Sequence, residues 1–110
     1  MRDALAVARE ALPEDVPVGA LLIQGDTVIA RACNDRERGR NPLGHAELNV
    51  LREGAQQLGR WRLSDTILVV TLEPCPMCAA AITQARVGQV VYGADDPLAG
   101  ACGSRWQLLD

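Results

Sequence analysis

Apolar residues at helical spacing alternate along the chain with short, nearly continuous apolar runs. A first helix is predicted over residues 2–12, where apolar side chains recur every three or four positions until Pro13. A second amphipathic helix is predicted to begin at His45 and to end at Gly59, with arginine, glutamate and glutamine on its polar side. Each helix is expected to pack its apolar face against a core.

The apolar runs predict strands. Residues 16–24 are expected to form an interior strand of a sheet, and Gly25 and Asp26 to form the tight turn into a returning strand over residues 27–32. Residues 66–72 are rich in valine and almost wholly apolar, which is typical of strands covered on both faces. A last strand is predicted over residues 89–92.

A third helix is predicted from Pro76 to about Arg86, because proline suits the first turn of a helix and a run of small residues follows it. Residues 34–44 and 95–104 lack periodicity and are predicted to be loops. Residues 105–109 are predicted to begin a further helix.

This order of elements predicts the fold class. From the second strand onward, strand, helix, strand, helix and strand alternate, which predicts right-handed crossovers and a largely parallel sheet between helices. Hydrophobic residues make up 48% of the 110, which suffices for one core at this length. The prediction is a single α/β domain over residues 1–110.

The charge of the chain limits how it could bind a partner. A formal net charge of −3 argues against a domain that grips nucleic acid by bulk positive charge. All eleven basic residues are arginine, however, and Arg36, Arg38 and Arg40 lie in the loop that leads to His45. Guanidinium groups suit phosphates and carboxylates alike, and the position of this loop beside His45 favours contact with a substrate.

No apolar run approaches the roughly 18 residues of a membrane span, and the first residues do not form a secretory apolar block, so we expect a cytoplasmic protein without membrane contact. The four cysteines, Cys33, Cys75, Cys78 and Cys102, are too few and too unevenly spaced for a disulfide framework. Reduced thiols or metal ligands are expected instead.

Two short motifs carry the candidate chemistry. His45-Ala46-Glu47 begins one predicted helix, and Pro74-Cys75-Pro76-Met77-Cys78 leads into the next. One imidazole, two thiols and one free carboxyl group are what a catalytic zinc with three protein ligands, an open position and a proton carrier requires. If the strands that precede the two helices are neighbours, both helix N-termini point to one spot at the carboxyl ends of the strands. Glu47 could then move protons without binding the metal.

Other interpretations of Cys-x-x-Cys are a redox pair and a structural zinc site. A structural site needs a fourth ligand, which only Cys33 or Cys102 could supply if His45 is the third. A redox pair has no use for His45-Ala46-Glu47 on a preceding helix. Both motifs together, each at a helix start, favour catalysis.

The two motifs match the H-x-E and P-C-x-x-C signature of zinc nucleobase deaminases. The chain as a whole resembles the cytidine deaminase-like zinc deaminases, and within them the bacterial tRNA-specific adenosine deaminases. The resemblance covers nearly all 110 residues and includes segments 16–20, 42–47, 70–75, 85–87, 93–96 and 100–101 together with Asn34. It implies a three-layer α/β/α cytidine deaminase-like fold, a single CMP/dCMP-type deaminase domain with a mixed sheet of about four strands.

The resemblance also implies a function, which is hydrolytic deamination of adenosine to inosine at the tRNA wobble position by a homodimer, with single-stranded DNA as a further candidate substrate. One Zn²⁺ per chain would be held by His45, Cys75 and Cys78, and Glu47 would shuttle protons. Substrate contacts would come from Asn34, the backbone at Ala46, the pocket residues Val18, Leu72 and Ala94, and, at the ribose, Asp96.

The chain departs from the family pattern in two ways. Asn41, Leu43 and Gly44 stand where the family usually has Asp, Thr and Ala, which removes one carboxylate and one hydroxyl near the substrate. Family members usually continue beyond the position of Asp110 with a last strand and a C-terminal helix that helps to hold tRNA, so we expect those elements to be missing here. Both departures concern recognition of a complete tRNA more than the zinc chemistry.

Two rival functions remain. One is deamination of a free base or nucleoside, such as guanine or cytosine, since Pro76-Met77 between the cysteines also looks like guanine deaminases. The other is an inactive partner subunit stabilised by zinc, which would have no need of Glu47.

Overall fold

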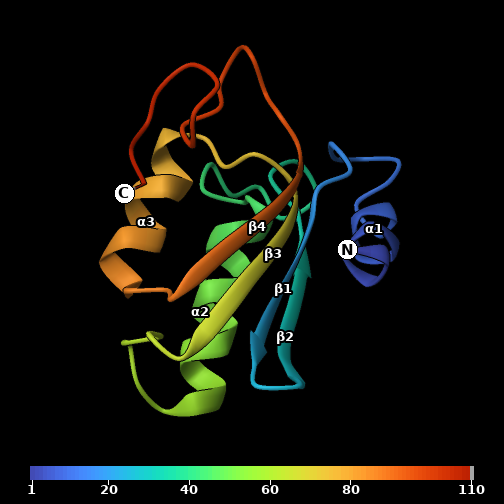
Figure 1. Ribbon diagram of the computed structural model, residues 1–110. Coiled ribbons are helices and arrows are strands. Elements are labelled where there is room, and N and C mark those ends of the chain that lie inside the picture. Colours follow the sequence, from blue (N-terminus) through green and yellow to red (C-terminus); the bar gives the residue numbers. More distant parts are fainter. Residues whose placement is uncertain (110) are drawn as a thin grey trace.

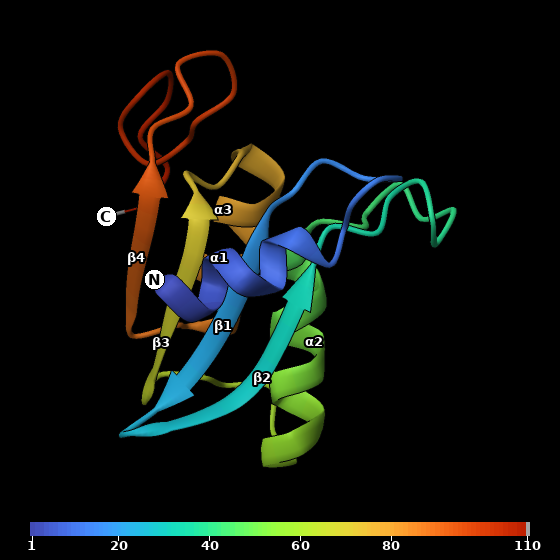
Figure 2. The same cartoon turned by 90° about the vertical axis from the view of Figure 1, so that its right-hand side faces the viewer.

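The computed structural model describes residues 1–109, and the elements form three layers. In chain order they are α1 (Arg2–Arg9), β1 (Gly19–Gln24), β2 (Thr27–Cys33), α2 (Ala46–Leu58), β3 (Thr66–Leu72), α3 (Pro76–Ala85) and β4 (Gln89–Ala94). The strands form one sheet in the order β2-β1-β3-β4. Helix α1 lies on one face of the sheet, and α2 and α3 lie on the other (Figures 1 and 2). No helix of residues 1–109 is long and apolar enough to cross a membrane.

The sheet is mixed, and the prediction of a largely parallel sheet is wrong. Strand β1 pairs antiparallel with β2 on one side and with β3 on the other, and only β3 and β4 are parallel. The hairpin explains the difference, because its first strand pairs with β3 and separates β3 from β2. The expectation of an interior first strand and of a three-layer mixed sheet of four strands is confirmed.

The predicted helix over residues 105–109 is absent. This segment runs back along the preceding loop, where the amides of Arg105 and Trp106 both donate to the Gly100 carbonyl and that of Leu108 donates to Ala101. Five residues are too few to offset the cost of nucleating a helix, and loop carbonyls satisfy these amides instead. The first helix is also shorter than predicted, because turns replace it after Arg9.

Two apolar clusters hold the layers together. The larger lies between the sheet and the helices α2 and α3 and includes the completely buried Leu22, Val50 and Leu68. The smaller fixes α1 through Val7 and Leu21. Glycine is needed at the start of β1, because a Cβ on Gly19 would lie 2.2 Å from the Ala4 carbonyl oxygen of α1.

The topology brings the starts of α2 and α3 together. Strands β2 and β3 both pair antiparallel with β1, so they run in the same direction and their carboxyl ends lie at the same edge of the sheet. The condition given above for this arrangement, that the two strands be neighbours, is not met, because β1 lies between β2 and β3. The helices still meet on one face, with the loops that follow β2, β3 and β4 gathered around their first turns (Figures 1 and 2).

Candidate active site

The residues predicted to bind zinc lie together. His45 and Cys75 are the N-cap residues of α2 and α3, both with extended backbone, and Cys78 is in the first turn of α3. Their candidate ligand atoms all lie within 4.8 Å of one another. The Nδ1 atom of His45 is 3.3 Å from Sγ of Cys78 and 3.6 Å from Sγ of Cys75. A tetrahedral zinc with ordinary Zn–N and Zn–S bonds separates such atoms by about 3.6 Å, so the three side chains fit this ion.

The surroundings of the two thiols favour ionisation of Cys75 and oppose that of Cys78. A hydrogen bond from the Cys78 thiol is the main cause that lowers the pKa of Cys75 to about 5, and the nearby His45 adds to it against the effect of burial. The pKa of Cys78 is raised, chiefly because Cys75 holds its proton and because it is fully buried. One thiolate is therefore present near neutral pH, and a bound cation would favour the second.

Neither Cys33 nor Cys102 belongs to this group among residues 1–109. The Cys33 sulfur instead accepts a hydrogen bond from Arg38 on the other side of the loop, at 3.5 Å. The fourth ligand of a closed structural zinc site is thus lacking in this group, which leaves the open position that a catalytic site requires.

Glu47 lies in the first turn of α2, is only 4% exposed, and lines the same cavity as His45 and Cys75. Burial is the main cause that raises the pKa of its carboxyl group, and the charge of His45 and a hydrogen bond with Cys78 oppose the effect. It is not one of the three grouped ligands. A buried carboxyl group with a raised pKa beside a metal site suits a group that both accepts and donates protons.

The cavity beside these residues has a volume of about 420 Å³. Five further lining residues bear on the predictions: Val18, Asn34, Leu72, Asp96 and Ala99. Ala94 does not line the cavity but is exposed at the end of β4, where its carbonyl accepts the Glu73 amide. Of the three apolar residues predicted to line the pocket, Val18 and Leu72 line this cavity. Ala94 does not, and the alanine that lines it is Ala99.

Asn34 is held in one orientation. Its side-chain Oδ1 accepts a hydrogen bond of 2.8 Å from the backbone amide of Ala46, and the backbone amide of Asn34 donates to the Val18 carbonyl. The backbone of Ala46, which was expected to help bind the base, is therefore engaged in fixing Asn34. The side-chain NH₂ of Asn34 remains as the group that can donate to a ligand.

The arginine loop is only partly at the site. Arg36 lines the cavity, whereas the Arg38 guanidinium turns away and donates to the Glu10 carbonyl, and Arg40 is exposed outside the cavity. The loop is fastened by Asp15, a buried carboxylate that accepts the backbone amides of Glu37 at 2.7 Å and Arg38 at 3.2 Å. Asp15 was not predicted as a site residue, because nothing in the local sequence marks an acid whose partners lie more than twenty residues away.

Glu73 was also not predicted as a site residue. It is 2% exposed and lines the cavity between Leu72 and the Pro74-Cys75 turn. Burial would raise its pKa, but hydrogen bonds from the Ser104 hydroxyl and from the amides of Asp96, Ser104 and Cys102 outweigh burial and lower the pKa to about 2. The one available signal was an acid directly before a zinc-binding turn.

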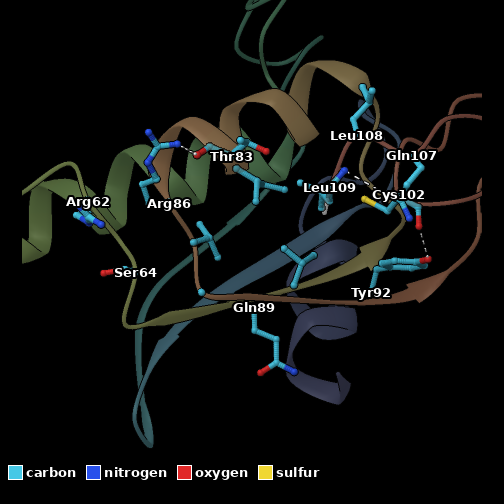
Figure 3. A pocket seen from close by; sticks show the side chains of 14 residues that line it. Arg62, Ser64, Thr83, Arg86, Gln89, Tyr92, Cys102, Gln107, Leu108 and Leu109 are labelled. Carbon is cyan, nitrogen blue, oxygen red and sulfur yellow. Dashed lines mark hydrogen bonds between the residues drawn. The ribbon is translucent and has the colours of Figure 1, made fainter.

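A larger cavity of about 800 Å³ lies between α3, β4 and the last residues (Figure 3). Arg86, Tyr92 and Cys102 are among its lining residues, and Tyr92 donates from its hydroxyl to the Cys102 carbonyl. None of the three grouped ligands and no part of Glu47 lines it, so its size does not make it the reaction site.

Known proteins share both the sequence and the fold. A chloroplastic tRNA(adenine(34)) deaminase from Arabidopsis thaliana is 52% identical over 110 residues, which are 99% of this chain and 8% of that protein. A tRNA-specific adenosine deaminase from Bacillus subtilis is 46% identical over 110 residues, which are 99% of this chain and 68% of that protein. The chain thus spans a small part of the first relative and about two thirds of the second.

A solved structure from studies of A-to-I editing by tRNA:A34 deaminases at the wobble position of transfer RNA matches with a TM-score of 0.91 and 46% identity, over 94% of this chain and 81% of that one. A guanine deaminase from Bacillus subtilis matches less closely, with a TM-score of 0.82 and 34% identity, over 86% of this chain and 61% of that one.

Residues 1–94 match the zinc-binding region of cytidine and deoxycytidylate deaminases, the stretch that contains both motifs of the site. With the group of His45, Cys75 and Cys78, this region gives the chain a place for one zinc ion. The chain belongs to the cytidine and deoxycytidylate deaminase zinc-binding family, and within that family to the tRNA-specific adenosine deaminases.

Proposed function

We propose that this chain catalyses the zinc-dependent hydrolysis of adenosine to inosine at the wobble position of tRNA. The observation that carries the proposal is the buried Glu47, which lies outside the group of one imidazole and two thiols that could hold one ion. The relatives named as tRNA adenine or adenosine deaminases are more similar to the chain than the guanine deaminase is.

A zinc ion held by His45, Cys75 and Cys78 would supply a water able to attack at neutral pH. Glu47 takes a proton from that water and delivers it to the ring nitrogen next to the reacting carbon. The water oxygen adds to C6 of adenine as a hydroxyl group. Glu47 then takes the remaining proton of this hydroxyl and gives it to the amino group, the C6–N bond breaks, and ammonia leaves while a carbonyl forms at C6. Protons and oxygen therefore balance without any further reactant.

The other cavity residues bind and orient the base. The NH₂ of Asn34 donates a hydrogen bond to a ring nitrogen of the purine, because its oxygen is already engaged by Ala46. Val18 and Leu72 form apolar walls against which the flat ring packs. One carboxylate oxygen of Asp96 accepts hydrogen bonds from the amides of Leu98 and Ala99, so the other oxygen can accept one from the ribose. A cavity of about 420 Å³ holds one nucleotide extruded from its stack.

A panel of substrates tests this proposal. We expect the purified chain to convert adenosine to inosine in an anticodon stem-loop, with a mass increase of about one dalton per target nucleotide as an amine is replaced by oxygen. Guanine, cytosine and a single-stranded DNA oligomer of the same sequence serve as comparisons. Faster loss of ammonia from guanine than from the stem-loop would assign the chain to free-base deamination, and no turnover of any of them by zinc-loaded protein would favour an inactive partner subunit.

We propose further that the chain acts as a homodimer in the cytoplasm, where tRNA is present and where cysteine side chains remain reduced. An almost wholly apolar groove of about 320 Å³ between α2 and α3 is lined by Leu48, Leu51 and Ala85, and Trp61 stands 64% exposed at its edge. A two-fold dimer can cover such a surface with its own copy.

Replacing Trp61 with arginine is expected to convert the dimer to a monomer, because it replaces a large exposed aromatic side chain of the proposed contact with a charge. Trp61 contributes little to the core at its exposure, so the variant should remain folded. Sedimentation velocity of both proteins measures the change, and an equal mass for both would exclude this surface as the interface.

A further inference from the structure

Glu73 accepts four hydrogen bonds, all from one loop. Its Oε1 accepts the Asp96 amide at 3.0 Å and the Ser104 hydroxyl, and its Oε2 accepts the amides of Cys102 at 2.9 Å and Ser104 at 3.0 Å. The loop over residues 95–104 has no regular structure other than short turns and an isolated bridge. These bonds join both ends of the loop to the end of β3, in addition to the hydrogen bonds that the loop makes within itself.

The same loop forms part of the cavity wall. Asp96 and Ala99 line the cavity from the loop side, and Glu73 lines it from the end of β3. The loop is also tied to the zinc-binding turn through the backbone, because the Ala101 amide donates to the Pro74 carbonyl at 2.8 Å. A displacement of this loop would therefore move the walls that meet the nucleotide while leaving His45 and Glu47 on α2 in place.

The site is built for a carboxylate. A glutamine would present an NH₂ group in place of one oxygen, facing either the Asp96 amide or the amides of Cys102 and Ser104. Two N–H donors would then face each other in a buried place, which costs the hydrogen bond and leaves a donor unpaired. Gly100 leaves the necessary room, since a Cβ there would lie 2.4 Å from Cδ of Glu73.

We propose that Glu73 is a positioning residue that holds the loop over residues 95–104 against the substrate cavity, and thereby sets the affinity for the RNA nucleotide without taking part in the proton transfers. The inference rests on the proposed function for its kinetic consequence. Its structural part, the fastening of the loop, depends only on the contacts described.

The Glu73→Gln variant is expected to retain one zinc per chain, to raise KM for an anticodon stem-loop at least about tenfold, and to change kcat by less than about threefold. Ser104→Ala, which removes one of the four bonds, should raise KM less than Glu73→Gln does. Ser104→Thr, which keeps the hydroxyl, should have the KM of the parent chain. Asp65→Asn is the matched control, because Asp65 also accepts side-chain hydrogen bonds but lies on the surface before β3, outside the cavity.

Hydrogen–deuterium exchange of the zinc-loaded proteins separates this proposal from the proposed function. In Glu73→Gln the amides of residues 96–104 should exchange at least about tenfold faster than in the parent, whereas those of α2 should not change. If the parent chain deaminates no RNA, the proposed function fails and the exchange result alone decides whether Glu73 fastens the loop.

Three results would overturn the proposal: unchanged exchange in residues 96–104, a fall in kcat with unchanged KM, or loss of zinc in proportion to activity. The first would deny the fastening, the second would place Glu73 in the chemistry, and the third would make it a support of the metal site. Should Glu73→Gln fail to fold, Gly100→Ala displaces the same loop with Glu73 intact and must give the same rise in KM and in exchange.

Discussion

The Glu47→Gln variant is expected to bind zinc as well as the parent chain and to lose between about 10² and 10⁴ in kcat. The amide has the size and shape of the carboxyl group, so the first turn of α2 and the neighbouring His45 should keep their places. It cannot accept a proton from water or carry one to the base. Single-turnover formation of inosine in a stem-loop, measured by mass spectrometry beside metal content, gives both quantities.

Glu53→Gln is the matched control for this prediction, because Glu53 lies on the same helix with its side chain exposed. It should retain full activity. If Glu47→Gln also remained fully active with one zinc bound, proton transfer would have to be assigned to another group. A variant that lost zinc together with activity would instead show that Glu47 supports the metal site.

The elements of the fold were predicted well where local pattern decides them. Pro76 and Gly59 mark the start of one helix and the end of another, and Gly59 has the left-handed backbone with φ of 68° that ends helices. The valine-rich run of β3 is likewise a strand over the predicted residues. These features depend on neighbours a few positions away, which the sequence displays directly.

The pairing of strands could not be obtained in this way. Whether β1 lies beside β3 depends on contacts between residues such as Leu22 and Leu68, which are far apart in the chain. The alternation of strands and helices predicted that β2 and β3 are parallel neighbours. This prediction is wrong because β1 lies between them and pairs antiparallel with both. The prediction of a helix over residues 105–109 failed for a different reason, because their amides bond to the Gly100 and Ala101 carbonyls in a loop instead of continuing a helical pattern.

The residues of the candidate site also differ in whether a local pattern marks them. His45, Cys75 and Cys78 were found because metal ligands come in short motifs whose spacing follows from the geometry of a helix start. Asp15 and Glu73 were not found, because each is a single acid whose partners are backbone amides of a loop elsewhere in the chain. Any residue type can supply a backbone amide, so no sequence pattern marks these contacts.

Removal of zinc is expected to destabilise the chain, and Cys75→Ala is the variant that isolates this effect. Cys75 is only half-buried, so the substitution leaves a small cavity, whereas the fully buried Cys78 would lose packing as well as a ligand. A ligand present at about a hundred times its Kd stabilises the folded state by about 2.7 kcal/mol. For a domain of this size we therefore expect Cys75→Ala to lose its zinc and to melt at least about 10 °C below the zinc-loaded parent.

Chelation should lower the melting temperature of the parent to that of the variant and leave the variant unchanged. Cys33→Ala removes a half-buried thiol outside the ligand group and should keep both zinc and the response to chelator. Equal melting temperatures for parent and Cys75→Ala, with zinc retained by both, would mean that this thiol does not hold the ion.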